Sequence, residues 1–171
     1  MELNIAPELK IAGRIGSAHL CGEYPDMELA GGAVALSKPV ELDVKYSFDG
    51  EAVTLTGTLA SAVRMNCTKC NEEIIRDFSV DFSERFLKVS ENEAEELECY
   101  AYSGDTLDLD RMVHDLVLLN APMYGTCRPG CKGLCPVCGT NLNKSQCSCS
   151  RVDESNPFAA LLGLKELLKD D

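Results

Sequence analysis

"VELDVKYSFDGEAVTLTGTLASAVRMNC", residues 40–67, carries the clearest structural signal in the chain. Its first part alternates apolar with polar side chains, which is typical of a half-buried β-strand. The apolar positions are Leu42, Val44, Tyr46 and Phe48. Asp49-Gly50 is a hairpin-turn dipeptide, and the alternation that follows it predicts a return strand. The apolar positions there are Val53, Leu55, Leu59, Val63 and Met65, and the strand leads to Cys67.

Further elements follow this hairpin. "IIRDFSVDFSERFL" (74–87) alternates in the same way and predicts another strand, and "LECYAYSG" (97–104) predicts a short one. "ENEAEELE" (91–98) contains five glutamates, and we expect a solvated loop there. "DLDRMVHDLVLLNAP" (108–122) has helical periodicity with Asp108 as the N-cap, and it predicts a helix that faces the core. The core-facing residues of this helix are Leu109, Met112, Val113, Leu116 and Val117.

The remaining segments complete the expected architecture. Residues 1–38 give a weak signal, and their topology stays open; "ELKIAGRIGSAHLCGEYP" (8–25) is compatible with one or two short strands. "FAALLGLKELLK" (158–169) predicts a C-terminal amphipathic helix. We predict an α+β fold: an antiparallel, hairpin-rich sheet with a central helix, a zinc-binding Cys module and a C-terminal helix. The predicted parts are a core domain at 1–122, the Cys-rich zinc module at 123–152 packed on the core, and the terminal helix at 153–171.

Eight of the ten cysteines form four close pairs. In a reducing compartment, "CTKC" and "CPVCG" indicate zinc rather than disulfides, because a tight turn directs both sulfurs to one ion. Four thiolates complete a closed, structural site, so eight cysteines predict two zinc ions. The predicted ligands are Cys67, Cys70, Cys127, Cys131, Cys135, Cys138, Cys147 and Cys149.

The spacing leaves two groupings open. In one, the last four cysteines form a local site and the first four form the other; in the second, "CTKC" and "CPVCG" share an ion. Loop-closure entropy favours the local grouping. A thioredoxin-like redox pair is disfavoured, because neither motif leads into a helix. Cys21 and Cys99 stand apart, and we expect them to be buried as small apolar residues.

Charge limits the partners. The net charge is −12, yet residues 123–152 lack acidic residues and carry four positive charges, so the rest of the chain carries −16. An acidic body disfavours general nucleic-acid binding and suits a basic protein, such as a ribosomal protein. The basic segment either contacts RNA or offsets thiolate charge. Its basic residues are Arg128, Lys132, Lys144 and Arg151.

Several function classes are disfavoured. No signal peptide or long apolar run is visible, so we expect a cytoplasmic protein that does not bind membranes. Gly-rich phosphate loops and catalytic constellations are absent, and His19 and His114 lack partners in sequence. We therefore expect no catalysis and no small-molecule substrate.

Four motifs occur in an order that resembles a known family. They are "MNCTKC" (65–70), "DTLDLDRMVHDLVLLNAPM" (105–123), "CRPGCKGLCPVCGTNLNKSQCSC" (127–149) and "NPFAALLGLKELL" (156–168). The chain resembles the bacterial YceD family, the large ribosomal RNA subunit accumulation proteins, over residues 40–168. The resemblance implies a non-enzymatic role in accumulation of large-subunit ribosomal RNA, and so in ribosome assembly. We expect the partner to be a ribosomal protein or a large-subunit precursor. A zinc-ribbon adaptor in transcription is the alternative.

Overall fold

The computed structural model describes residues 1–29 and 32–149. The chain forms two compact units, and the first consists of residues 1–65 and 73–125. The second combines residues 66–72 with the chain from residue 126 onwards. The loop that carries the first cysteine pair thus belongs to the same unit as the other six cysteines of the predicted sites. The parts predicted from sequence are continuous stretches of chain, so they place residues 66–72 in the core domain and not with the later cysteines.

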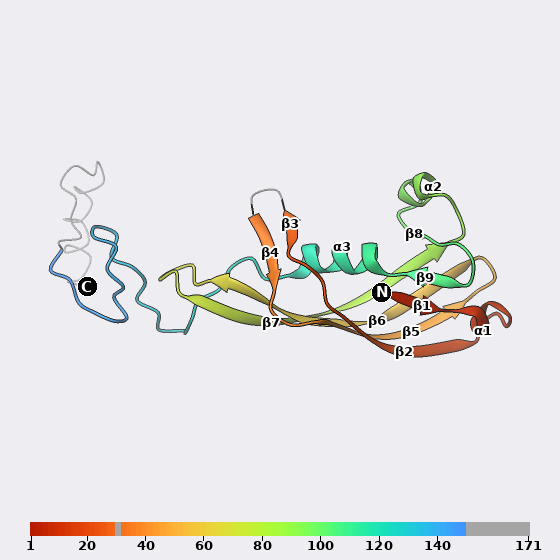
Figure 1. Ribbon diagram of the computed structural model, residues 1–171, viewed down its shortest axis with the longest axis horizontal. Coiled ribbons are helices and arrows are strands. Elements are labelled where there is room, and N and C mark those ends of the chain that lie inside the picture. The colour runs from red at the N-terminus through yellow and green to blue at the C-terminus, as the bar shows by residue number, and fades with distance from the viewer. Residues whose placement is uncertain (30–31, 150–171) are drawn as a thin grey trace, which may run out of the picture. The chain divides into compact units, whose positions relative to one another are not determined.

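A mostly antiparallel sheet forms the first unit (Figure 1). Its strands are β2 (Ile15–Gly22), β3 (Met27–Leu29), β4 (Gly32–Leu36), β5 (Val40–Phe48), β6 (Ala52–Asn66), β7 (Glu73–Leu87) and β8 (Tyr100–Ala101). The long strand β6 is central, because β5, β4 and β7 all pair with it. β7 and β8 are parallel, and β1 (Glu2–Asn4) forms a separate antiparallel pair with β9 (Thr106–Asp108).

The predicted hairpin is confirmed as β5 and β6. Tyr46 pairs with Leu55 in an antiparallel register that continues along both strands. At the turn, Asp49 Oδ1 accepts hydrogen bonds from the backbone N–H groups of Glu51 (2.9 Å) and Ala52 (2.8 Å). The N–H of Ala52, and then that of Glu51, hold the pKa of Asp49 below its usual value. The return strand continues without interruption to Asn66, next to Cys67.

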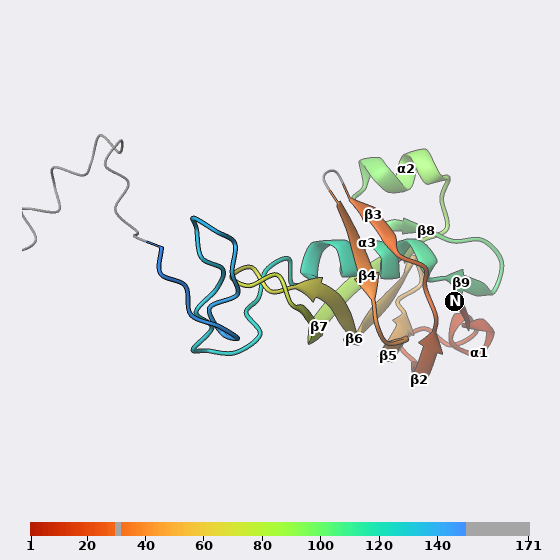
Figure 2. The ribbon, with the colours of Figure 1, turned by 60° about the vertical axis from the view of Figure 1, so that its left-hand side comes forward.

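Helix α3 (Asp110–Asn120) lies along one face of the sheet (Figures 1 and 2). The apolar face predicted from its periodicity is buried, and its side chains join those of the strands in one core. The predicted N-cap is wrong by one residue: Leu109 is the N-cap, while Asp108 Oδ1 accepts the N–H of Asp110 at 3.0 Å. No helix in the described ranges is long and apolar enough to cross a bilayer.

Three other expectations need correction. The glutamate-rich segment is not a loop but begins with a helix, α2 (Glu91–Glu96), whose first turn is held by reciprocal bonds between Ser90 and Glu93. Cys21 is exposed and Cys99 is only half-buried, so neither is a core residue.

The stretch at residues 8–25 contains one strand, β2, as expected. The whole N-terminal region forms β1, α1 (Ala6–Leu9), β2, β3 and β4. The predicted helix at 153–171 lies outside the described residues.

Candidate metal centres

Eight cysteines form two groups of four in the second unit. The first group contains Cys67, Cys70, Cys127 and Cys131, and the second contains Cys135, Cys138, Cys147 and Cys149. Within each group all sulfur atoms lie within 4.8 Å of one another. This is the local grouping that loop-closure entropy favours. Each four-cysteine cluster can hold a metal ion.

The first cluster takes one pair of cysteines from the loop between the paired strands β6 and β7. In that loop the N–H of Cys67 bonds to the carbonyl of Glu72 at 2.8 Å, and the N–H of Asn71 bonds to the carbonyl of Cys67 at 2.9 Å. Asn71 has a positive φ of 58°, which lets the chain turn sharply after Cys70. The loop therefore presents both sulfurs from one tight turn.

Distances between sulfur atoms in the first cluster suit a tetrahedral ion. Cys67 Sγ lies 3.9 Å from Cys131 Sγ, and Cys70 Sγ lies 3.6 Å from Cys127 Sγ. Metal–sulfur bonds of about 2.3 Å in a tetrahedron place the sulfurs about 3.8 Å apart. A disulfide would require about 2.05 Å. Three of the four residues are buried, with Cys67 only 2% exposed.

The second cluster is local and more open. The N–H of Cys135 bonds to the carbonyl of Thr140 at 2.8 Å, and the N–H of Gly139 bonds to the carbonyl of Cys135 at 2.9 Å. Gly139 adopts φ 72°, as the tight turn after "CPVC" requires. Only Cys135 is buried here, whereas Cys138 is exposed and the other two cysteines are half-buried. Figure 2 shows residues 126–149 as successive loops.

The thiols within the two clusters have pKa values shifted in opposite directions. Burial alone would raise the pKa of Cys67, but N–H donors led by that of Cys127 outweigh it and lower the pKa to about 6. The hydroxyl and N–H of Thr140 lower the pKa of Cys138 to about 6. In contrast, the adjacent sulfur of Cys138 raises the pKa of Cys149 to about 12. Four adjacent thiols cannot all ionise unless positive charge lies among them.

The four basic residues of the Cys-rich segment have different surroundings. Arg128 and Lys132 are exposed. Lys144 is paired with Glu72, whose carboxylate lies 2.7 Å from its Nζ. Sequence reasoning missed this pair because the two residues come from distant segments. Arg151 lies outside the described residues.

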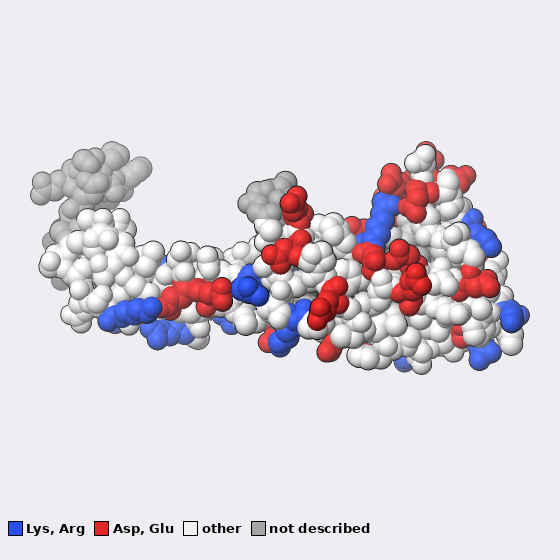
Figure 3. Space-filling view, in the orientation of Figure 1, with Lys and Arg blue, Asp and Glu red and all other residues white. Residues whose placement is uncertain are grey.

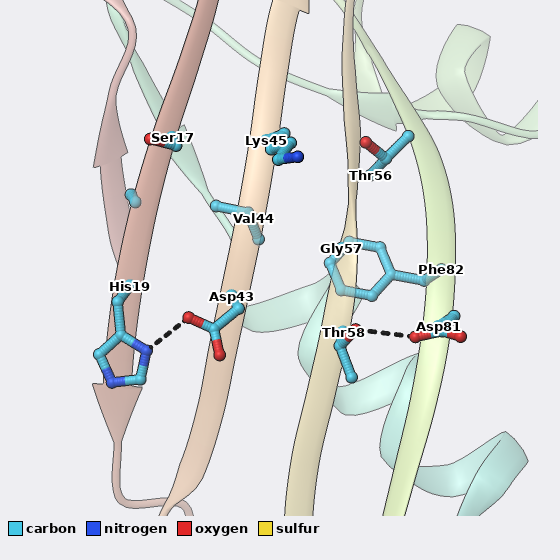
Figure 4. A pocket seen from close by; sticks show the side chains of 11 residues that line it. Ser17, His19, Asp43, Val44, Lys45, Thr56, Gly57, Thr58, Asp81 and Phe82 are labelled. Carbon is cyan, nitrogen blue, oxygen red and sulfur yellow. Dashed lines mark hydrogen bonds and ion pairs between the residues drawn. The ribbon is translucent and has the colours of Figure 1, made fainter.

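A shallow hollow of about 740 Å³ lies on the first unit, across β2, β5, β6 and β7 (Figure 4). Four of its polar groups form two pairs: His19 Nδ1 lies 2.8 Å from Asp43 Oδ1, and the Thr58 hydroxyl donates to Asp81 at 2.7 Å. His19 thus has a partner that the sequence did not reveal. His114, on α3, lies 3.5 Å from a carboxylate oxygen of Asp115.

Together the fold and the clusters define a β-sheet protein with two four-cysteine clusters, each of which could hold a metal ion. The model of the family described as "Large ribosomal RNA subunit accumulation protein YceD" matches residues 55–165. The chain belongs to the YceD family, which is linked to accumulation of large-subunit ribosomal RNA.

Relatives agree with this assignment. The chain is 24% identical, over 86% of its length, to the chloroplastic YCED homolog 1 of Arabidopsis thaliana, and 26% identical, over 80%, to that of Zea mays. An uncharacterized protein of Mycobacterium tuberculosis is 32% identical over 60% of the chain. These alignments cover 52%, 59% and 51% of the relatives, so the chain spans about half the length of the curated relatives it matches. No solved structure matches the chain.

Proposed function

We propose that this protein is a non-enzymatic zinc-binding factor that supports accumulation of large-subunit ribosomal RNA and ribosome assembly. The family match over residues 55–165 carries the biological part of the proposal. The two four-cysteine clusters carry the chemical part. In the proposed role the clusters stabilise the fold and leave no open coordination position for a substrate.

Zinc is the metal that the donor sets suit best. Four sulfur ligands in a tetrahedral arrangement are typical of structural zinc, and iron–sulfur clusters are the other common occupant. Zinc requires no change of oxidation state and no added sulfide, so the chain's own thiolates complete each site. An ion in the first cluster would tie the loop between β6 and β7 to the segment after residue 126, and an ion in the second would close residues 135–149 on themselves. That segment lacks regular secondary structure as far as residue 149.

We infer that the direct partner is a basic ribosomal protein rather than RNA. Each zinc ion with four thiolates carries a net charge of −2. Two such centres outweigh the net +3 of the other side chains in residues 66–72 and 126–149. No aromatic residue for base stacking occurs in these two segments.

On the first unit, acidic side chains gather over α2 (Figure 3). Glu91 and Glu95 on this helix pair with Arg111 at 2.8 and 3.0 Å, whereas the other glutamates of the helix form no ion pair within the described part of the chain. A surface of this sign attracts basic proteins and repels phosphate backbones.

The metal part is tested by elemental analysis of the untagged protein purified under reducing conditions. We expect two equivalents of zinc in the unsubstituted protein and about one in Cys138→Ala. Cys21→Ala is the matched control, because Cys21 is also exposed but lies outside both clusters. It should retain two equivalents. Less than one equivalent in the unsubstituted protein would contradict the proposal, and iron with acid-labile sulfide would replace zinc as the metal.

The biological part is tested by deleting the gene and measuring the ratio of large- to small-subunit ribosomal RNA. We expect the ratio to fall and to recover on complementation. Tagged protein captured from nuclease-treated lysate should retain a ribosomal protein, and raised salt should weaken its binding. Loss of the partner after nuclease treatment would favour direct RNA contact. Enrichment of RNA polymerase with an unchanged RNA ratio would instead support a transcription adaptor.

A further inference from the structure

The segment at residues 139–146 joins the two cysteine pairs of the second cluster, but its polar side chains contact the first cluster. Asn143 Nδ2 lies 3.4 Å from Cys131 Sγ and donates a hydrogen bond to it. The same side chain accepts the N–H of Lys132 at 2.9 Å through Oδ1. Asn143 is therefore fixed at both ends, with its donor directed at a sulfur of the other cluster.

Asn141 and Lys144 extend this contact to the cysteine loop between β6 and β7. Asn141 Oδ1 accepts from both the N–H and the Nδ2 of Asn143, each at 2.9 Å. Asn141 Nδ2 in turn reaches Glu72 Oε1 at 3.4 Å, and Lys144 Nζ lies 2.7 Å from the same oxygen. Glu72 closes the turn that presents Cys67 and Cys70.

Backbone contacts hold the same pieces together. The N–H of Leu134 donates to the carbonyl of Lys69, in the first cysteine loop, at 2.9 Å. The N–H of Leu142 donates to the carbonyl of Gly133 at 2.9 Å. A Cβ at Gly133 would approach the carbonyl oxygen of Lys69 to 3.0 Å. The backbone at Gly133 therefore packs closely against the backbone of the first cysteine loop.

Residues next to metal ligands matter because they orient the ligands and supply hydrogen bonds to their charged atoms. Loss of such a residue typically lowers metal affinity 10- to 100-fold. Here these residues lie on a segment whose two ends are the ligand pairs of the second site. An ion in the second site would restrict that segment and so reduce the entropy lost in holding Asn143 against Cys131.

We propose that the two metal sites are coupled, with Asn143 as the positioning residue through which the second site stabilises the first. This inference rests on the proposed function for the presence of zinc, but it concerns how the sites depend on each other. The second cluster is the more exposed one, so its ion leaves first. Its loss releases the segment at 139–146 and weakens the buried site.

The test is release of zinc from the full chain to a colorimetric chelator. For the unsubstituted protein we expect two phases of one equivalent each, with the slow phase from the buried site. Asn143→Ala should accelerate the slow phase about tenfold or more. Asn143→Asp keeps the acceptor for the N–H of Lys132 but loses the donor to Cys131, so it should also accelerate that phase. Gln146→Ala, at an exposed position on the same segment, should change neither phase.

A second variant tests the link between the sites. Cys147→Ser combined with Cys149→Ser removes the second site, and the remaining equivalent should leave faster than the slow phase of the unsubstituted protein. Far-UV circular dichroism checks that the sheet is intact. Two equivalents of zinc in the unsubstituted protein, together with an unchanged slow phase in the Asn143 variants and in the double cysteine variant, would overturn the coupling alone. A protein purified without metal would overturn both the coupling and the zinc part of the proposed function.

Discussion

Gly57, in the middle of β6, is a residue whose side chain the fold excludes. A Cβ at this position would lie 2.1 Å from the carbonyl oxygen of Asp43 on the neighbouring strand. Real Cβ atoms do not approach a carbonyl so closely, so the backbone of β5 or β6 would have to move. The glycine is thus required by close approach of two strands and not by a left-handed φ.

We predict that Gly57→Ala destabilises the first unit by about 2 kcal/mol or more, because the displaced atoms are backbone and cannot rotate away. The measurement is chemical denaturation followed by circular dichroism. Gly130→Ala is the matched control, since a Cβ there meets nothing within 4 Å, and it should change the free energy of unfolding by less than about 0.5 kcal/mol. Equal stability of the two variants would show that the strands can separate at this point.

At the residue scale, the sequence identified all eight cysteines that the structure groups, because thiol pairs at short spacing have few other uses in a reducing compartment. It did not identify Asn141, Asn143 or Glu72. Asparagines and glutamates are common in turns for many reasons. Their contacts here depend on segments that come together only in the fold, so no local pattern distinguishes them.

At the element scale, regular periodicity was informative and local charge was misleading. The β5–β6 hairpin and α3 were predictable because each combines a clear apolar period with an end signal. The segment at α2 was assigned to a loop because glutamates dominate it, yet glutamate is a good helix former and Ser90 supplies a capping box. Strand β1 pairs with β9, far along the chain, so its neighbours in sequence say little about it.

Helix α3 offers a direct test of which apolar residues hold it to the sheet. Met112 is fully buried, whereas Leu119 on the same helix is 81% exposed. We predict that Met112→Ala lowers the free energy of unfolding by about 2–5 kcal/mol, since it leaves a cavity in the core. Leu119→Ala should change it by less than about 0.5 kcal/mol. Urea denaturation measures both, and a large loss from Leu119→Ala would reveal packing beyond the contacts described here.

At the scale of the whole molecule, the two units depend on different forces. The first has a continuous apolar core, while in the second the described residues that are buried include the clustered cysteines Cys67, Cys70, Cys131 and Cys135. Structural zinc sites contribute folding energy directly, with apparent binding free energies of about 10–16 kcal/mol in small domains. We infer that the sheet survives without metal and that the second unit does not.

Removal of metal with a strong chelator under reducing conditions should therefore act on one unit. We predict that amide hydrogens of residues 126–149 lose protection from exchange, while those of β5 and β6 remain protected. Mass spectrometry of the exchanged peptides measures both regions in one experiment. Re-addition of zinc should restore the protection. Simultaneous loss of protection in β5 would show that the units fold as one.

The interleaved route of the chain also has a consequence for timing. Cys70 precedes Cys127 by 57 residues, which at 5–20 residues per second corresponds to about 3–11 s of synthesis. For that interval the first two thiols exist without their partners, on a loop whose flanking strands can already pair. During that time Cys67 and Cys70 lack Cys127 and Cys131, and their thiols are accessible to oxidants and to competing metals. The first cluster can be completed only after Cys131 has been made.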